Sequence, residues 1–126
     1  MTAPLTRKVM AYQELMKTLV PTVHESTDWE PLSEFVVLGE FRRIGTLLEV
    51  QDWPQYTEML TRWARSIDTF DTVVKRVTEV PGLVYFEIEE RHTRGERTRV
   101  VNSMTVFDFD DDEKIRGLAV YLQQAQ

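Results

Sequence analysis

Few residues in this sequence could do chemistry, because cysteine is absent and only two histidines occur. The lack of cysteine excludes disulfides, thiolate nucleophiles and cysteine-type metal sites. His24 and Asp28 are spaced so that the carboxylate could orient the histidine as a base, although a polar loop histidine is the simpler interpretation. His92 lies near the expected tip of a hairpin, beside Arg97, and is interpreted as a solvated residue.

An acidic segment near the end of the chain has the spacing of a calcium-binding loop, with Asp108, Asp110 and Asp112 in a D-x-D-x-D pattern. That motif continues with Gly at its sixth position and Glu at its twelfth, but Glu113 and Ala119 stand there. The segment is therefore predicted to be a solvated acidic turn. We expect neither a metal nor an organic cofactor.

The composition suits a single folded domain over residues 1–126, since 42% of the residues are hydrophobic and 29% are charged. A net charge of −6 makes nucleic acid an unfavourable partner. The basic stretch 91–99 is flanked by glutamates, which indicates a solvated hairpin rather than a polyanion site. The sequence shows neither a signal-peptide core nor a membrane span, so we expect a cytoplasmic protein without membrane contact.

Two helices are predicted in the first half of the chain. Apolar residues recur every three to four positions over 5–20, and the helix should end before Pro21. The second helix is predicted over 53–67, because Asp52 is a good N-cap and Gln55 completes a capping box.

The segment between these helices is harder to interpret from its residue types. A short helix is expected with Ser26 or Thr27 as its cap. Within 34–50 we expect two short strands, with turns at Gly39 and Gly45.

The last third of the chain is predicted to be a sheet, with strands over 70–80, 83–93, 97–109 and 114–122. Helices followed by a long antiparallel run of strands indicate the α+β class.

The charges of the hairpin beside Gly95 favour a register with Glu90 opposite Arg99 and His92 opposite Arg97. This register puts on one face Val84, Phe86, Ile88, Val101, Ser103, Thr105 and Phe107. The opposite face then carries Tyr85, Glu87, Glu89, Val100, Asn102, Met104 and Val106.

The segment 104–122, MTVFDFDDDEKIRGLAVYL, resembles the closing strands of the NTF2-like superfamily, in its SnoaL-like polyketide cyclase and ketosteroid isomerase branch. The helix at 5–20 and the helix that begins WPQYTEML also lie where that family has helices. The resemblance implies a cone-like, curved antiparallel or mixed β-sheet (NTF2-like or cystatin-like) wrapped around N-terminal helices. It further implies an apolar pocket at the mouth of the cone and a homodimer that forms through the outer sheet face.

Carried over residue by residue, the resemblance places Tyr12 where isomerases of the family have an oxyanion donor. Arg42 or Arg43 falls where they have the base carboxylate, and Thr105 or Ser103 falls where they have a protonated acid. Ketosteroid isomerisation is therefore not expected, because proton abstraction beside a carbonyl needs a base.

The resemblance also implies a set of pocket residues, although aromatic residues at these spacings equally suit a closed core. The predicted ligand-binding residues are Tyr12, Trp29, Tyr56, Trp63, Phe86, Ser103, Thr105 and Leu118. The candidates for catalysis are Tyr12, Arg42, His24 and Asp28.

Two functions fit this sequence. The first is a domain that binds a small apolar or amphipathic molecule, with cofactor-free acid–base catalysis of the cyclase, hydratase or isomerase type. The second is a non-enzymatic ligand-binding or dimeric interaction domain. An open pocket with a titratable residue near Tyr12 would favour the first function, and a closed polar cluster would favour the second.

Overall fold

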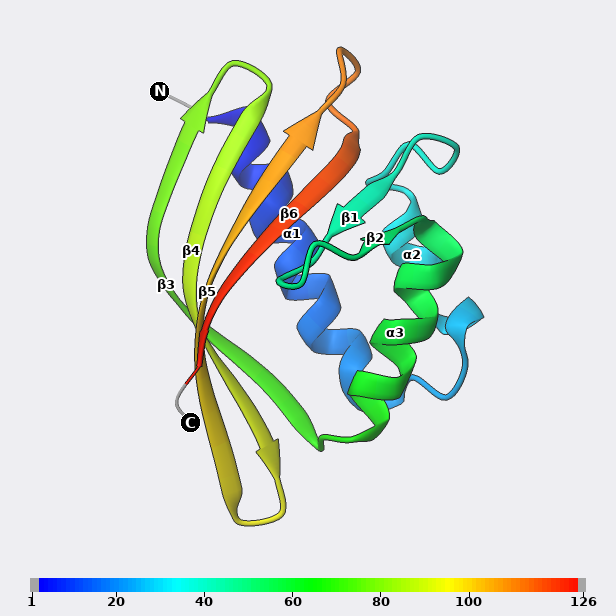
Figure 1. The fold of residues 1–126 in the computed structure, drawn as a ribbon, viewed down its shortest axis with the longest axis vertical. Helices are drawn as coiled ribbons and strands as arrows, with labels where there is room; N and C mark the ends of the chain where they lie inside the picture. Colours follow the sequence, from blue (N-terminus) through cyan, green and yellow to red (C-terminus); the bar gives the residue numbers. More distant parts are fainter. Residues whose placement is uncertain (1–2, 125–126) are drawn as a thin grey trace.

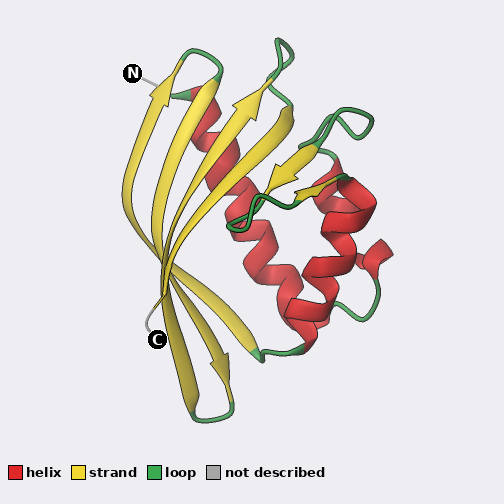
Figure 2. Cartoon of the chain, in the orientation of Figure 1, coloured by secondary structure: helices red, strands yellow, loops and turns green. Residues whose placement is uncertain are grey.

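The computed structural model describes residues 3–124, which form three α-helices packed against a curved, unclosed sheet of six strands (Figures 1 and 2). The helices are α1 (Pro4–Leu19), α2 (Glu30–Ser33) and α3 (Trp53–Arg65). The strands are β1 (Arg42–Ile44), β2 (Val50–Gln51), β3 (Thr69–Val80), β4 (Leu83–Arg94), β5 (Arg97–Phe109) and β6 (Ile115–Gln124). The strand order is β2-β1-β6-β5-β4-β3, and only the β1–β6 pair is parallel among these described strands. The predicted α+β class and mixed, curved sheet are confirmed.

Both long helices form where the sequence predicts them. Helix α1 ends at Leu19, directly before a short 3-10 turn that contains Pro21. At the start of α3 the side chain of Asp52 accepts from the Gln55 backbone N–H at 2.9 Å. The Gln55 side chain in turn accepts from the Asp52 backbone N–H at 3.0 Å. The predicted capping box is confirmed, and it fixes where α3 leaves the edge of the sheet.

The region between α1 and α3 differs from the prediction in two ways. The short helix begins at Ser26 as a 3-10 turn, but its cap is Glu25, which pairs with Asp28 in a capping box. The apolar run 35–38 forms no strand; its Val36 makes only an isolated bridge to Ile115. The two short strands lie later in the chain, on either side of the turn at Gly45.

The β4–β5 hairpin has a register two residues away from the predicted one. Its turn is Gly95-Glu96 rather than Arg94-Gly95, and Gly95 takes a positive φ of 59°. His92 consequently lies opposite Arg99 instead of Arg97. Side chains alternate along a strand, so a shift of two residues leaves every side chain on its predicted face.

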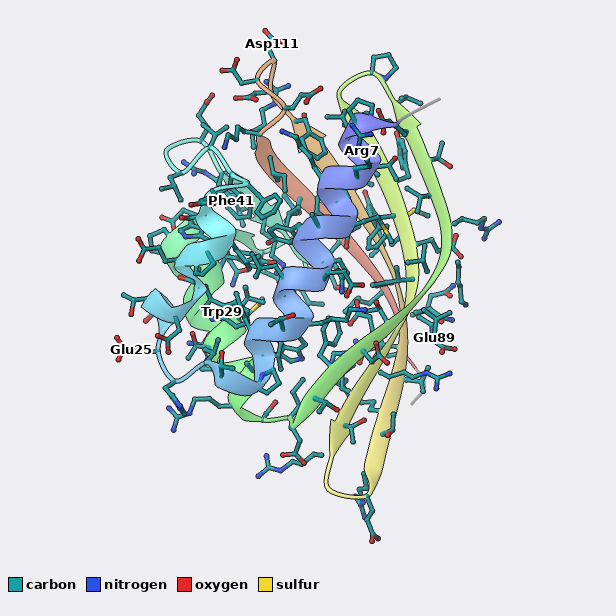
Figure 3. All side chains as sticks on the ribbon, turned by 180° about the vertical axis from the view of Figure 1, so that it is seen from behind. Arg7, Glu25, Trp29, Phe41, Glu89 and Asp111 are labelled. Carbon is teal, nitrogen blue, oxygen red and sulfur yellow. The ribbon has the colours of Figure 1, made fainter. Side chains whose placement is uncertain are left out.

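The inner face of the sheet packs against α1 and α3, as Figure 1 shows. Predicted inner-face residues such as Val84 and Phe107 are almost completely buried, whereas outer-face Tyr85 is 38% exposed. Figure 3 shows Glu89 pointing away from the helices on that outer face. Within residues 3–124, none of the helices has the length and apolar character needed to cross a membrane.

Candidate functional site

A cavity of about 300 Å³ lies between the inner sheet face, α1 and α3. Most of its wall is apolar and comes from both helices and from strands β4, β5 and β6. Six polar or charged side chains of particular interest also line it, namely Tyr12, Gln13, Arg43, Tyr56, Glu90 and His92. An apolar cavity with a few convergent polar groups is the usual form of a small-molecule site.

Two buried tyrosines form the first polar group in the cavity. Tyr12 on α1 and Tyr56 on α3 place their hydroxyl oxygens 3.2 Å apart, and either hydroxyl can be the donor. Burial raises the pKa of Tyr12 well above its ordinary value, and the neighbouring Tyr56 adds to this. Burial also raises the pKa of Tyr56. Both phenols therefore stay protonated near neutral pH and remain available as hydrogen-bond donors.

Arg43 brings a positive charge to the same part of the cavity. Its side chain is mostly buried, and its Nη1 donates to Gln51 Oε1 at 2.9 Å and lies 3.8 Å from the Glu49 carboxylate. The guanidinium carbon is 5.9 Å from the centre of the Tyr56 ring. The charge of Arg43 acts against the burial effect and lowers the pKa of both Tyr12 and Tyr56.

A hydrogen-bonded chain of three side chains forms the second polar group. The indole Nε1 of Trp63 donates to His92 Nδ1 at 2.9 Å. The other ring nitrogen, His92 Nε2, lies 2.9 Å from Glu90 Oε1. His92 is only 7% exposed, so the expectation of a solvated hairpin histidine is wrong. Strand β4 brings His92 under α3, where the Phe70 ring lies 5.3 Å from the imidazole.

Sequence reasoning missed Glu90 and His92, although a signal for them was present. The alternation that buries Val84, Phe86 and Ile88 continues to Glu90 and His92, so all five side chains share the inner face. The high charge of the hairpin hid this pattern. Gln13 was missed as well: its side chain lines the cavity, and its buried Nε2 has no partner among the described residues.

The structure brings five of the eight predicted ligand-binding residues to the cavity wall. These are Tyr12, Tyr56, Trp63, Thr105 and Leu118. Trp29, Phe86 and Ser103 are buried but do not line this cavity. Trp29 is fully buried and donates its Nε1–H to Thr61 Oγ1 at 3.1 Å, which makes it a core residue.

Three of the candidates for catalysis lie away from the cavity. The Asp28 carboxylate accepts from the backbone N–H groups of His24 at 2.9 Å and Glu25 at 3.1 Å. These two bonds, the His24 one first, lower the pKa of Asp28. Asp28 thus closes a turn rather than orienting the His24 ring. Arg42 is exposed and donates to the Phe41 carbonyl.

The acidic turn after β5 is organised by its own backbone. Asp110 Oδ1 accepts from the N–H groups of Asp112 at 3.0 Å and Lys114 at 2.9 Å. Across residues 3–124, His, Asp and Glu side chains form no group of three with the spacing of a metal site.

Comparison with known proteins identifies the fold. No protein-family model matches this sequence, and a search of curated protein sequences finds no match. Solved structures do match. An NTF2-like protein from Anabaena variabilis ATCC 29413 superposes with a TM-score of 0.77 at 16% identity, over 99% of this chain and 96% of that chain.

Two further structures are of enzymes. An epoxide hydrolase of LEH-like type from M. tuberculosis gives a TM-score of 0.71 at 14% identity, over 94% of this chain and 82% of that chain. The second is the epoxide hydrolase/cyclase-like enzyme SalBIII, with a role in pyran ring formation in the polyether salinomycin. It gives a TM-score of 0.72 at 11% identity, over 95% of this chain and 91% of that chain. The chain therefore has the NTF2-like fold, which the resemblance of residues 104–122 predicts and which SnoaL-like proteins share.

Proposed function

We propose that this protein binds a small, mainly apolar molecule in the cavity and catalyses a proton transfer on it without a cofactor. The observation that carries the proposal is the Glu90 carboxylate, which lines the apolar cavity while hydrogen-bonded to buried His92. A carboxylate held in this way is a suitable general base.

The two tyrosines would stabilise the negative charge that develops on the ligand. When a base removes a proton from carbon, negative charge develops on an oxygen or nitrogen of the ligand. In the Tyr12–Tyr56 pair one hydroxyl donates to the other, so one hydroxyl hydrogen is left over for a ligand. Arg43 lies against Tyr56, and its positive charge favours a developing anion nearby.

Glu90 and the tyrosine pair belong to one site rather than two. Both line the same cavity, and the negative charge of Glu90 contributes, after burial, to the raised pKa of Tyr56. A base and an acid donor in the wall of one cavity suit ring closure, hydration or isomerisation. The hydrolase and cyclase activities of structural neighbours with this fold are compatible with such chemistry.

The base is tested with 5-nitrobenzisoxazole, a small and flat probe. Removal of its C3 proton by a base breaks the ring N–O bond and gives a nitrile and a coloured phenolate, so the reaction is followed by absorbance. We expect the protein to accelerate ring opening and Glu90→Gln to lower kcat/KM by about 100-fold, within the usual contribution of a positioned general base.

Glu89→Gln is the matched control for this experiment. Glu89 is the next residue on β4 but lies on the outer face, where it pairs with Arg91 at 2.8 Å. The control should retain the wild-type rate. Equal rates for the Glu90 and Glu89 variants would contradict the proposal, and binding of the probe without turnover would favour the non-enzymatic alternative.

A second candidate function is dimerisation through the outer sheet face. Several apolar side chains on that face remain exposed, namely Val73 at 49%, Tyr85 at 38%, Val100 at 47% and Tyr121 at 62%. A second copy of the chain would cover them. Light scattering should then give twice the chain mass for the wild type and the chain mass for Tyr121→Glu, with Glu58→Ala on α3 as the unchanged control. A monomeric wild type would refute this assembly.

A further inference from the structure

The chain of Trp63, His92 and Glu90 has a direction that follows from the chemistry of its members. An indole N–H is only a donor, so His92 Nδ1 must accept from Trp63 and cannot carry a proton. A neutral imidazole has one N–H, which must then be on Nε2. His92 Nε2 therefore donates to Glu90 Oε1 at 2.9 Å, and only this tautomer satisfies both contacts.

The surroundings of His92 keep the ring in this orientation. The imidazole packs against the Trp63 ring, at 5.5 Å, and against the Phe70 ring, at 5.3 Å between centroids. Trp63 and Phe70 also contact each other edge to face at 4.8 Å. Rotation of the ring by half a turn would bring carbon atoms toward both partners and break both hydrogen bonds.

We propose that Trp63 is a positioning residue that selects the Nε2–H tautomer of His92 and thereby makes His92 a fixed donor to Glu90. The proposal deepens the proposed function and rests on it for the catalytic meaning of Glu90. Its structural content, the selection of the tautomer by Trp63, stands independently of any reaction.

This arrangement divides the roles within the chain. Both ring nitrogens of His92 are already engaged, so the imidazole cannot accept a proton from a ligand unless a hydrogen bond breaks. A proton on Nδ1 would face the Trp63 N–H, donor against donor. Glu90 keeps one oxygen beyond the one held by His92, so Glu90 rather than His92 is the group that exchanges a proton with the ligand. A histidine in a cavity is often taken to be the base, but here we assign that role to Glu90, with His92 as its hydrogen-bond donor.

The test is the tautomeric state of His92, measured by long-range proton–nitrogen NMR correlation on the ¹⁵N-labelled protein. We expect an unprotonated Nδ1 and a protonated Nε2 in the wild type. His24 is exposed and serves as the internal reference, since a solvated imidazole exchanges between both tautomers. A wild-type His92 with its proton on Nδ1, or with averaged tautomers, would overturn the proposal without any variant.

Glu90 is an acceptor-only carboxylate that also favours a proton on Nε2, so the role of Trp63 is tested in the Glu90→Gln background, where the amide can donate or accept. His92 should keep the Nε2–H tautomer in Glu90→Gln. It should lose it in Glu90→Gln/Trp63→Phe, which removes the indole N–H and keeps an aromatic ring against Phe70. Loss in Glu90→Gln alone, or retention in the double variant, would show that Trp63 does not select the tautomer. Neither result depends on a ligand, so failure of this inference is distinguishable from failure of the benzisoxazole test.

Discussion

The cavity contains two polar groups that are built on different principles. The Tyr12–Tyr56 pair consists of two identical groups, each able to donate or accept. The chain from Trp63 through His92 to Glu90 begins at an obligate donor and ends at an acceptor. Its two hydrogen-bonding protons therefore lie on Trp63 Nε1 and His92 Nε2. The difference shows how a fold can combine an adaptable donor with a directed base in one cavity. We therefore expect the loss of one member to cost less stability in the pair than in the chain.

The largest effect on stability should come from removing the middle of the directed chain. His92→Leu leaves the Trp63 N–H and the Glu90 carboxylate, both partly buried, without their partner. We expect the free energy of unfolding to fall by about 3 kcal/mol, the range for buried polar groups that lose their hydrogen bonds. Urea denaturation measures this. A loss no larger than that of Tyr12→Phe would remove the distinction between chain and pair.

Alkaline pH should act on the tyrosine pair. Both folded-state pKa values are raised above the ordinary 10.0, so the unfolded chain loses these protons first as pH rises. The stability contributed by the two phenols is therefore complete below pH 10 and is lost above it. Between pH 10 and pH 11 the wild type should therefore lose more stability than the Tyr12→Phe/Tyr56→Phe variant. Identical pH profiles from urea denaturation would show that the pair is not protected by burial.

The adaptability of the pair predicts a strong coupling between its members. Tyr12→Phe and Tyr56→Phe should each cost about 1 kcal/mol, because one hydroxyl loses its partner. The double variant should cost much less than the sum, since no unpaired hydroxyl remains. A double-mutant cycle by thermal or urea unfolding measures the coupling. Additive costs would mean that each hydroxyl has another partner.

The smallest effect is expected at Gln13, which belongs to neither group. Its buried Nε2 lacks a hydrogen-bond partner within the described part of the chain, so Gln13→Leu should raise the free energy of unfolding by about 0.5 kcal/mol. Gln13→Glu, which places a charge at the same position, should lower it. Destabilisation by leucine would indicate a bound water or ligand that uses the amide.

The sequence predicts those parts of the fold that depend on neighbouring residues or on alternation. The capping box of Asp52 and Gln55 is local, and its geometry follows from two side chains and two backbone N–H groups. The sheet faces follow from the period of two, and they were correct even though the hairpin register was not. The alternation of faces is easier to predict than the hairpin register. The register was inferred from cross-strand charge pairs, and each such pair contributes less than about 1 kcal/mol.

The candidate site could be predicted only in part, because it depends on contacts between distant elements. Tyr12 and Tyr56 were predicted as pocket residues from the family resemblance, but their hydroxyl contact depends on how α1 and α3 cross. The burial of His92 depends on the path of β4 under α3, which no local pattern describes. The run 35–38 has strand-forming residues, yet its pairing with the sheet is limited to one isolated bridge, between Val36 and Ile115.

The parallel pairing of β1 with β6 has a consequence for the order in which the protein is made. Arg43 reaches the cavity from β1, where it pairs with Leu118 on β6. Synthesis runs from the N-terminus, so β1 can pair with its neighbour β2 early but with β6 only after most of the described chain has been made. Leu118, Val120 and Leu122 of β6 line the cavity, so the cavity wall is incomplete without this strand. A chain without β6 would have an incomplete site and would leave the edge of β5 unpaired, and an unpaired edge is a template for pairing with other chains.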